Sequence, residues 1–254
     1  MRQAVATIDA LLRLKLARWH FELARPAEPA ELALSQLTGI EASDPGWDAV
    51  ERELGRAALE AAVAEEGVAL ADLERAVAKL AGHVERALLG PVHGALRGDT
   101  VLVDVNGRME LTGFGGAGIR WRALDFLSLE CALKFDLAIQ QVADESLMRM
   151  ERALESHGPD DRPRALVLAL GELPHGRRLA TSAACVAAVR KAALEAGAVS
   201  DAAQYRRGLA LMTAGLLGAP GERNVSYLVR SLAHHVRLAE PGYRGDQEAI
   251  SSPA

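Results

Sequence analysis

The side chains that could do chemistry in this chain gather in one segment, residues 92–130. The segment holds one histidine, His93, which could act as a general base because imidazole titrates near neutral pH. Its acids could bind a divalent metal through carboxylate oxygens, and those nearest the histidine are Asp99, Asp104 and Glu110. A metal site needs its ligands to converge in space, so this chemistry remains an open alternative.

The same segment contains a cluster of glycines in the run Gly113-Phe114-Gly115-Gly116-Ala117-Gly118. Such a cluster indicates a sharp turn or a close approach of two backbones. Its spacing also satisfies the Gly-x-Gly-x-x-Gly pattern of dinucleotide-binding folds. That pattern needs a helix directly after it and a βαβ unit around it, whereas the helical pattern here begins only near Asp125. We therefore consider dinucleotide binding the weaker alternative.

A hairpin should separate the histidine from the glycines. The apolar stretches 101–104 and 109–112 flank an Asn106-Gly107 pair, which is a strong signal for a tight turn between two strands.

Taken together, the segment resembles the kinase-like phosphotransferases of the aminoglycoside and choline kinase type. Their sites read His-Gly-Asp-Leu-His, then Asn, a hairpin and Asp-Phe-Gly. The matching residues are His93, Gly94, Leu96, Phe114 and Gly115. Within that group the chain is similar to the bacterial ternary complex associated domains, in which an Asp-Phe-x-x-Leu-Glu stretch follows the glycines. Asp125, Phe126, Leu129 and Glu130 match that stretch, and the likeness continues through residues 186–190 and Tyr205 to a helix ending near Leu238.

The departures from the family pattern fall on the residues that do its chemistry. The resemblance implies a loop aspartate that deprotonates the attacking hydroxyl, and an asparagine and a second aspartate that hold magnesium. This chain has Ala95, Thr100 and Gly113 at those places. Loss of a general base costs about 10²–10⁴ in rate, so the usual reaction is not expected.

The resemblance also implies roles for the residues that remain. His93 would brace the loop through packing and hydrogen bonds. Asp125 would either cap its own helix or reach back to loop amides near His93, and both roles are structural.

A phosphotransferase of this type also needs an amino-terminal β-lobe with a lysine that binds the nucleotide. Residues 1–90 show helical periodicity instead, for example at Leu73, Val77, Leu80, Val84 and Leu88. The chain has four lysines, and none stands out as a nucleotide ligand: Lys15, Lys79, Lys134 and Lys191.

Composition narrows the function classes. A net charge of −5 and the absence of a long basic run predict no binding to nucleic acid or to an anionic membrane. We expect a cytoplasmic protein with no membrane span, in which Cys131 and Cys185 are buried free thiols. The adjacent His234 and His235 should point to different sides of a helix, which disfavours a shared metal site.

The expected fold class is mainly α with a small β-hairpin, like the helical C-terminal lobe of a kinase-like phosphotransferase that lacks its N-terminal β-lobe. Residues 1–240 should form one helical domain, and residues 241–254 a disordered tail. Within the domain we expect a connector with one short helix at 25–46, a loop at 156–164, and helices at 125 onward, 179–196, 202–217 and 223–239.

Two functions remain open. The first is a catalytically inactive lobe that serves as an interaction or regulatory module with a protein partner, without a cofactor or a metal. Its partner surface would be Arg120, Trp121 and Arg122, whose residue types are common at binding hot spots. The alternative is that these residues only line the former active-site cleft. The second is a split phosphotransferase that obtains its nucleotide lobe from another polypeptide and its metal ligands from Asp99 or Asp104. The sequence predicts no oligomeric state.

Overall fold

The computed structural model describes residues 2–12, 29–40, 46–104, 109–137, 142–156, 163–219 and 223–239. The expected Asn106-Gly107 turn and the expected disordered tail at 241–254 lie outside these residues.

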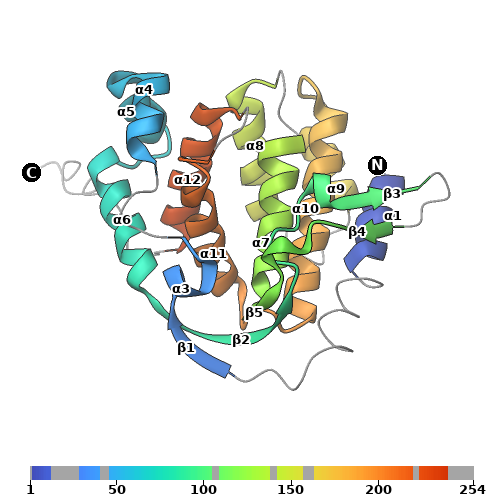
Figure 1. Cartoon of the computed structure of the whole chain (residues 1–254). Coiled ribbons are helices and arrows are strands. Elements are labelled where there is room, and N and C mark those ends of the chain that lie inside the picture. Colours follow the sequence, from blue (N-terminus) through green and yellow to red (C-terminus); the bar gives the residue numbers. More distant parts are fainter. Residues whose placement is uncertain are drawn as a thin grey trace, which may run out of the picture.

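Helices dominate the described chain, and a small amount of antiparallel sheet accompanies them, as the coarse fold class predicted (Figure 1). The α-helices are α1 (Arg2–Ala10), α3 (Leu34–Thr38), α4 (Trp47–Leu54), α5 (Arg56–Ala64), α6 (Leu70–Gly82), α7 (Ala123–Cys131), α8 (Asp144–Ser156), α9 (Pro163–Leu170), α10 (Gly176–Glu195), α11 (Ala202–Gly215) and α12 (Val225–Ala239). A π-helical segment, Ala132–Leu137, continues α7, and short 3₁₀ turns form at Gly98–Thr100 and Phe114–Gly116. None of the helices in the described residues is both long and apolar enough to cross a membrane.

The strands form two separate antiparallel sheets. β1 (Pro29–Ala33), β2 (Val84–Val92) and β5 (Gly118–Trp121) make a three-stranded sheet in the order β1-β2-β5. β3 (Val101–Val103) and β4 (Met109–Leu111) make the expected hairpin. In Figure 1 the long β2 curves beneath the helices, and the β3–β4 hairpin projects to one side.

Local chemistry explains where the last two long helices begin. The Asp201 side chain accepts a hydrogen bond from the backbone N–H of Gln204 at 2.8 Å, which caps α11. The Asn224 side chain accepts from the N–H of Tyr227 at 3.0 Å at the start of α12. The helices expected at 202–217 and 223–239 are confirmed to within two residues at each end, and α10 begins three residues before its expected start.

The core lies where α7, α10, α11 and α12 pack against one another. It is filled mainly by leucine, valine and alanine, and its largest fully buried side chains include Trp121 and Tyr227. Both cysteines are buried free thiols, as expected, and burial raises the pKa of Cys131 to about 12.

The expected helical run through Val84 and Leu88 is wrong. α6 ends at Gly82, and both residues lie in β2. The connector at 25–46 holds the expected short helix, α3, but it also contributes β1, which pairs with β2. The physical reason is that β2 finds its partners far away in the chain, so its hydrogen bonds leave no local signal in the sequence.

Candidate functional site

The loop after β2 is held by a buried carboxylate from α7. Asp125 Oδ2 accepts a hydrogen bond from the backbone N–H of His93, and Asp125 Oδ1 accepts one from that of Gly94, each at 2.9 Å. Asp125 is fully buried, and it lies in the first turn of α7 without capping that helix. Of its two expected roles, reaching back to the loop amides is therefore the one that the structure shows.

Burial and hydrogen bonding act in opposite directions on this carboxyl group. Burial raises the pKa of Asp125, and the N–H groups of His93 and Gly94 partly offset that rise because they stabilise the charged form. The two loop amides thus favour the ionised form of a carboxyl group that burial disfavours.

His93 braces the same loop and does not face solvent. Its side chain is fully buried, and Nε2 lies 2.6 Å from the carbonyl oxygen of Thr112. A carbonyl oxygen only accepts hydrogen bonds, so Nε2 must carry the proton. The ring also packs against Phe114, with ring centroids 4.8 Å apart. These contacts fit a structural side chain better than a general base.

The three positions that would do phosphotransferase chemistry offer no metal ligand set. Ala95 has no polar side-chain atom. The Thr100 hydroxyl accepts from the N–H of Arg97 and donates to the carbonyl oxygen of the same residue, each at 2.9 Å, so it closes the 3₁₀ turn. Gly113 has a positive φ of 75°, and a Cβ added there would lie 3.0 Å from Thr100 Cγ2.

The glycine-rich run passes so close to the loop that a side chain on Gly94 would clash with it. Gly94 has a φ of 80°, and an added Cβ would lie 2.1 Å from the carbonyl oxygen of Gly116. Only glycine fits this crossing, as the glycine cluster predicted. The run continues into a 3₁₀ turn and β5 rather than a helix, so it lacks the geometry of a dinucleotide site.

The acids near the loop do not converge. Asp99 is exposed and pairs with Arg97 at 3.2 Å, and both Asp104 and Glu110 are exposed. Within the described ranges, no group of three or more histidine, cysteine, aspartate or glutamate side chains could hold a metal ion. The alternative metal site at these acids therefore has no geometric support.

The expected partner surface is wrong for two of its three residues. Trp121 is fully buried, its Nε1 donates to the carbonyl oxygen of Ala198 at 3.2 Å, and Arg122 is only 8% exposed. Arg120 is exposed. Residues in a strand point alternately to opposite faces, so β5 directs Trp121 into the core against α11 and leaves Arg120 outside.

Glu130, the last matched residue of α7, belongs to a buried ionic network that sequence reasoning did not foresee. Glu130 accepts hydrogen bonds from Arg190 Nη2 at 2.8 Å and from the Tyr205 hydroxyl at 2.9 Å. Arg190 also pairs with Glu155 at 2.6 Å. The Asp-Phe-x-x-Leu-Glu stretch pointed to Glu130, but not to its partners on α10 and α11.

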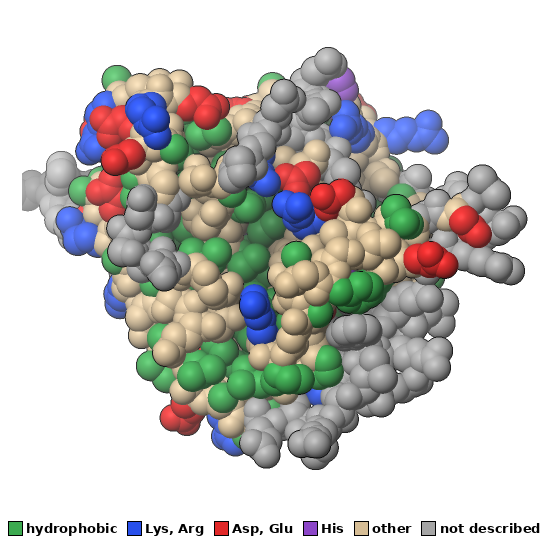
Figure 2. Space-filling view, in the orientation of Figure 1, with side chains coloured by type: hydrophobic (Ala, Val, Ile, Leu, Met, Phe, Trp, Pro, Cys, Tyr) green, Lys and Arg blue, Asp and Glu red, His purple; other side chains and the backbone are tan. Residues whose placement is uncertain are grey.

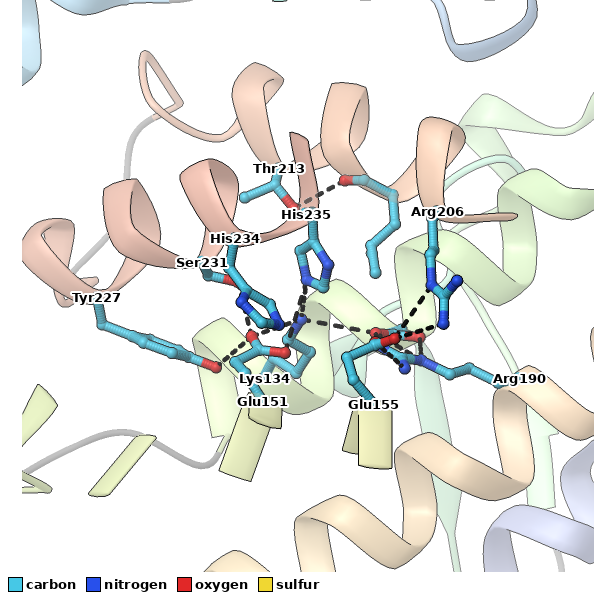
Figure 3. Close-up of polar contacts among 12 residues, drawn as sticks. Lys134, Glu151, Glu155, Arg190, Arg206, Thr213, Tyr227, Ser231, His234 and His235 are labelled. Carbon is cyan, nitrogen blue, oxygen red and sulfur yellow. Dashed lines mark hydrogen bonds and ion pairs between the residues drawn. The ribbon is translucent and has the colours of Figure 1, made fainter. Parts of the chain in front are cut away.

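A second half of this network surrounds Lys134 in the π-helical segment. Its Nζ lies 2.7 Å from Glu151 Oε1 and 2.8 Å from His235 Nε2, and all three side chains are fully buried (Figure 3). The hydroxyls of Tyr227 and Ser231 donate to the same Glu151 oxygen.

The imidazole nitrogen that accepts from an ammonium group cannot itself be protonated, so His235 is neutral. Burial and the nearby Lys134 charge both lower the pKa of His235. His235 therefore belongs to the core, and the neighbouring His234 is also buried, at 3% exposure.

No protein-family model, no curated protein and no solved structure matches this chain.

Proposed function

We propose that this chain is a catalytically inactive, phosphotransferase-like lobe that acts as an interaction or regulatory module in a bacterial signalling or conflict system in the cytoplasm. The observation that carries the proposal is the bond from one carboxylate, Asp125, to two successive loop amides. The loop frame is built on a buried carboxyl group, and burying such a group is costly unless it is hydrogen-bonded.

The loop keeps its supporting hydrogen bonds although the three positions that would do the chemistry carry no reactive side chain. Ala95 and Gly113 have no ligand atoms, and the Thr100 hydroxyl is already engaged in its own turn. A fold that keeps its supporting contacts and lacks its reactive groups suits a scaffold that presents a surface. The net charge of −5 argues against nucleic acid and anionic membranes as partners. A protein is the partner class that this charge leaves open.

Nucleotide binding separates this proposal from a split phosphotransferase. Purified protein would be melted with ATP or GTP at saturating concentration, with and without magnesium or manganese. A ligand that binds only the folded state at 100 times its Kd adds about 2.7 kcal/mol to the free energy of unfolding, which raises the melting temperature measurably.

We expect no metal-dependent rise in melting temperature. A rise that disappears in Asp99→Asn or Asp104→Asn would contradict the proposal and favour the split enzyme. A rise that survives both substitutions would equally contradict an inactive lobe and would place the nucleotide elsewhere.

A further inference from the structure

We propose that the outer edge of β5 is a docking site for an extended segment of a protein partner, with acidic side chains on one face and apolar side chains on the other. The inference rests on the proposed role as an interaction module, because it assigns the surface that such a module would use. It replaces the expected surface at Arg120, Trp121 and Arg122 with a strand edge.

The hydrogen-bond register shows which backbone groups of β5 point away from the sheet. The N–H of Arg122 donates to the carbonyl oxygen of Leu88 at 3.0 Å, so Arg122 and Leu88 form a hydrogen-bonded pair of the antiparallel ladder. Such pairs recur at every second residue, which places Arg120 opposite Gly90 in the next pair. The N–H and C=O groups of Ile119 therefore point to the other side, away from β2.

β5 is a terminal strand, since the sheet order is β1-β2-β5. Residues Ala117 to Arg120 are exposed, and Ile119 is 70% exposed. In the part of the chain that the structure describes, the backbone groups of Ile119 make no hydrogen bond outside the β2–β5 ladder. An edge of this kind is a template for another strand.

The opposite edge of the sheet is protected, which makes the open edge informative. On β1 the outward positions are Pro29, Glu31 and Ala33, because the N–H of Leu34 donates to the carbonyl oxygen of His83 in the ladder with β2. Proline has no N–H to offer, the Ala33 N–H donates to the Gln36 side chain at 3.0 Å, and Glu31 is exposed and charged. These are devices by which natural proteins block an edge. β5 contains no proline, and its charged residue, Arg120, directs its own backbone groups toward β2 rather than outward.

The side chains of β5 define the chemistry of the partner. Ile119 lies on the same face of the strand as the buried Trp121, so an added strand would meet it with an apolar side chain. Arg120 lies on the other face, and no acidic side chain among the described residues pairs with it. An acidic side chain on the added strand would supply that pair. In Figure 2, hydrophobic side chains gather where Figure 1 places β1, β2 and β5, which adds apolar surface beside this edge.

A second copy of the chain is a poorer occupant. Two β5 edges could pair about Ile119, which would put Arg120 opposite Gly118 and leave it without an acid. A shift of one step would put Arg120 opposite Arg120, and like charges directly opposite destabilise a sheet. The charge pattern therefore favours a different, acidic chain.

The test uses a short synthetic peptide that alternates valine and glutamate, with a valine–lysine peptide as its control. Binding is followed by the amide resonances of the isotope-labelled full chain. We expect the valine–glutamate peptide to shift the Ile119 amide at millimolar concentration and the valine–lysine peptide to leave it unchanged. No shift with either peptide, or equal shifts with both, would overturn the inference.

Two variants locate the site. Ile119→Pro removes the outward N–H without touching the ladder to β2, and it should weaken the peptide by about tenfold, the effect of losing one good hydrogen bond. Arg120→Glu should reverse the preference, so that the valine–lysine peptide binds instead. Two matched surface changes serve as controls, Leu168→Lys on α9 and Arg149→Glu on α8. The leucine is 72% exposed and the arginine side chain is 57% exposed. Proline is not used at Leu168 because it would break the helix. Both surface changes should leave peptide binding unchanged.

Sedimentation of the free chain completes the experiment. A dimer that Ile119→Pro converts to monomer would overturn the acidic partner and show a second copy as the occupant. Failure of the proposed function would appear separately, as metal-dependent nucleotide binding, whatever the peptide does.

Discussion

At the residue scale, Asp125 joins the first turn of α7 to the loop that follows β2. Asp125→Asn would keep the shape of the side chain but turn an amide N–H₂ toward one backbone N–H, leaving that donor buried and unpaired. We expect a loss of about 1–3 kcal/mol in the free energy of unfolding, measured by urea denaturation, and faster hydrogen exchange at His93 and Gly94. Asp99→Asn, on an exposed side chain, should change stability by less than about 0.5 kcal/mol. Equal losses in the two variants would contradict the role of Asp125.

Glu155 should make the protein sensitive to acid. Burial works to raise its pKa, but the charges of Arg190 and Arg206 outweigh burial and lower the pKa to about 2. A carboxyl group with a lowered pKa stabilises the fold fully above its unfolded pKa, near 4.5, and loses that contribution as pH falls through 2. The contribution is on the order of 3 kcal/mol.

The check is urea denaturation of the wild type and of Glu155→Gln at pH 6 and at pH 3. Other carboxyl groups titrate in the same window, so the informative quantity is the difference between the two proteins. That difference should be large at pH 6 and smaller at pH 3. A difference that stays constant with pH would contradict the assignment.

At the element scale, the packing of β5 on α11 depends on one glycine. A Cβ added at Gly208 would lie 2.7 Å from Trp121 Cη2 and 2.9 Å from Leu127 Cδ1. Gly208→Ala should therefore cost about 1–3 kcal/mol, because overpacking forces side chains off their preferred rotamers. Gly82→Ala, at the end of α6, meets nothing within 4 Å and should be neutral or stabilising by up to about 1 kcal/mol. Thermal unfolding of the two variants should thus give shifts of opposite sign or of very different size.

Some elements could be predicted from the sequence because their signals are local. The hairpin at 101–112 and the helices at the C-terminal end follow from turn residues, caps and apolar spacing within a few residues. The sheet β1-β2-β5 could not be predicted, because Pro29 pairs with Leu88 and Leu89 pairs with Trp121. The spacing of Val84 and Leu88 continues the helical pattern of α6, and Gly82 is the one local sign that the helix ends.

Prediction of the candidate site from the sequence meets the same limit, because its contacts join residues far apart in the chain. The Asp125 contact to the loop was among the expected alternatives because the resemblance named both partners. The outward placement of Arg120 and the inward placement of Trp121 follow from strand alternation, which needs β5 to be recognised first. The acids and bases of the buried network come from six helical segments, and nothing in the spacing of Glu151 or His235 identifies their partners.

At the scale of the whole molecule, this network ties the helical bundle together. Three buried or mostly buried carboxylates face three cations across the π-helical segment, α7, α8, α10 and α11: Glu130, Glu151 and Glu155 with Lys134, Arg190 and Arg206. The formal charges balance, so the group can lie in the core without a net charge. We expect such a network to contribute more to the choice of one packing arrangement than to total stability, and each member depends on its partners.

That dependence predicts strong coupling between Lys134 and Glu151, whose charged atoms are 2.7 Å apart and fully buried. Lys134→Met would leave Glu151 charged in the core and should cost about 3–5 kcal/mol. Adding Glu151→Gln removes that unpaired charge, and the amide oxygen can still accept from Tyr227 and Ser231. The double variant should therefore be more stable than the sum of the single losses predicts, by about 1–3 kcal/mol in a double-mutant cycle measured by urea denaturation.

Lys191 and Glu195, 3.8 Å apart on the surface of α10, are the control pair, and the same substitutions there should couple by less than about 1 kcal/mol. Additive losses at Lys134 and Glu151 would mean that the two side chains are neighbours without depending on each other.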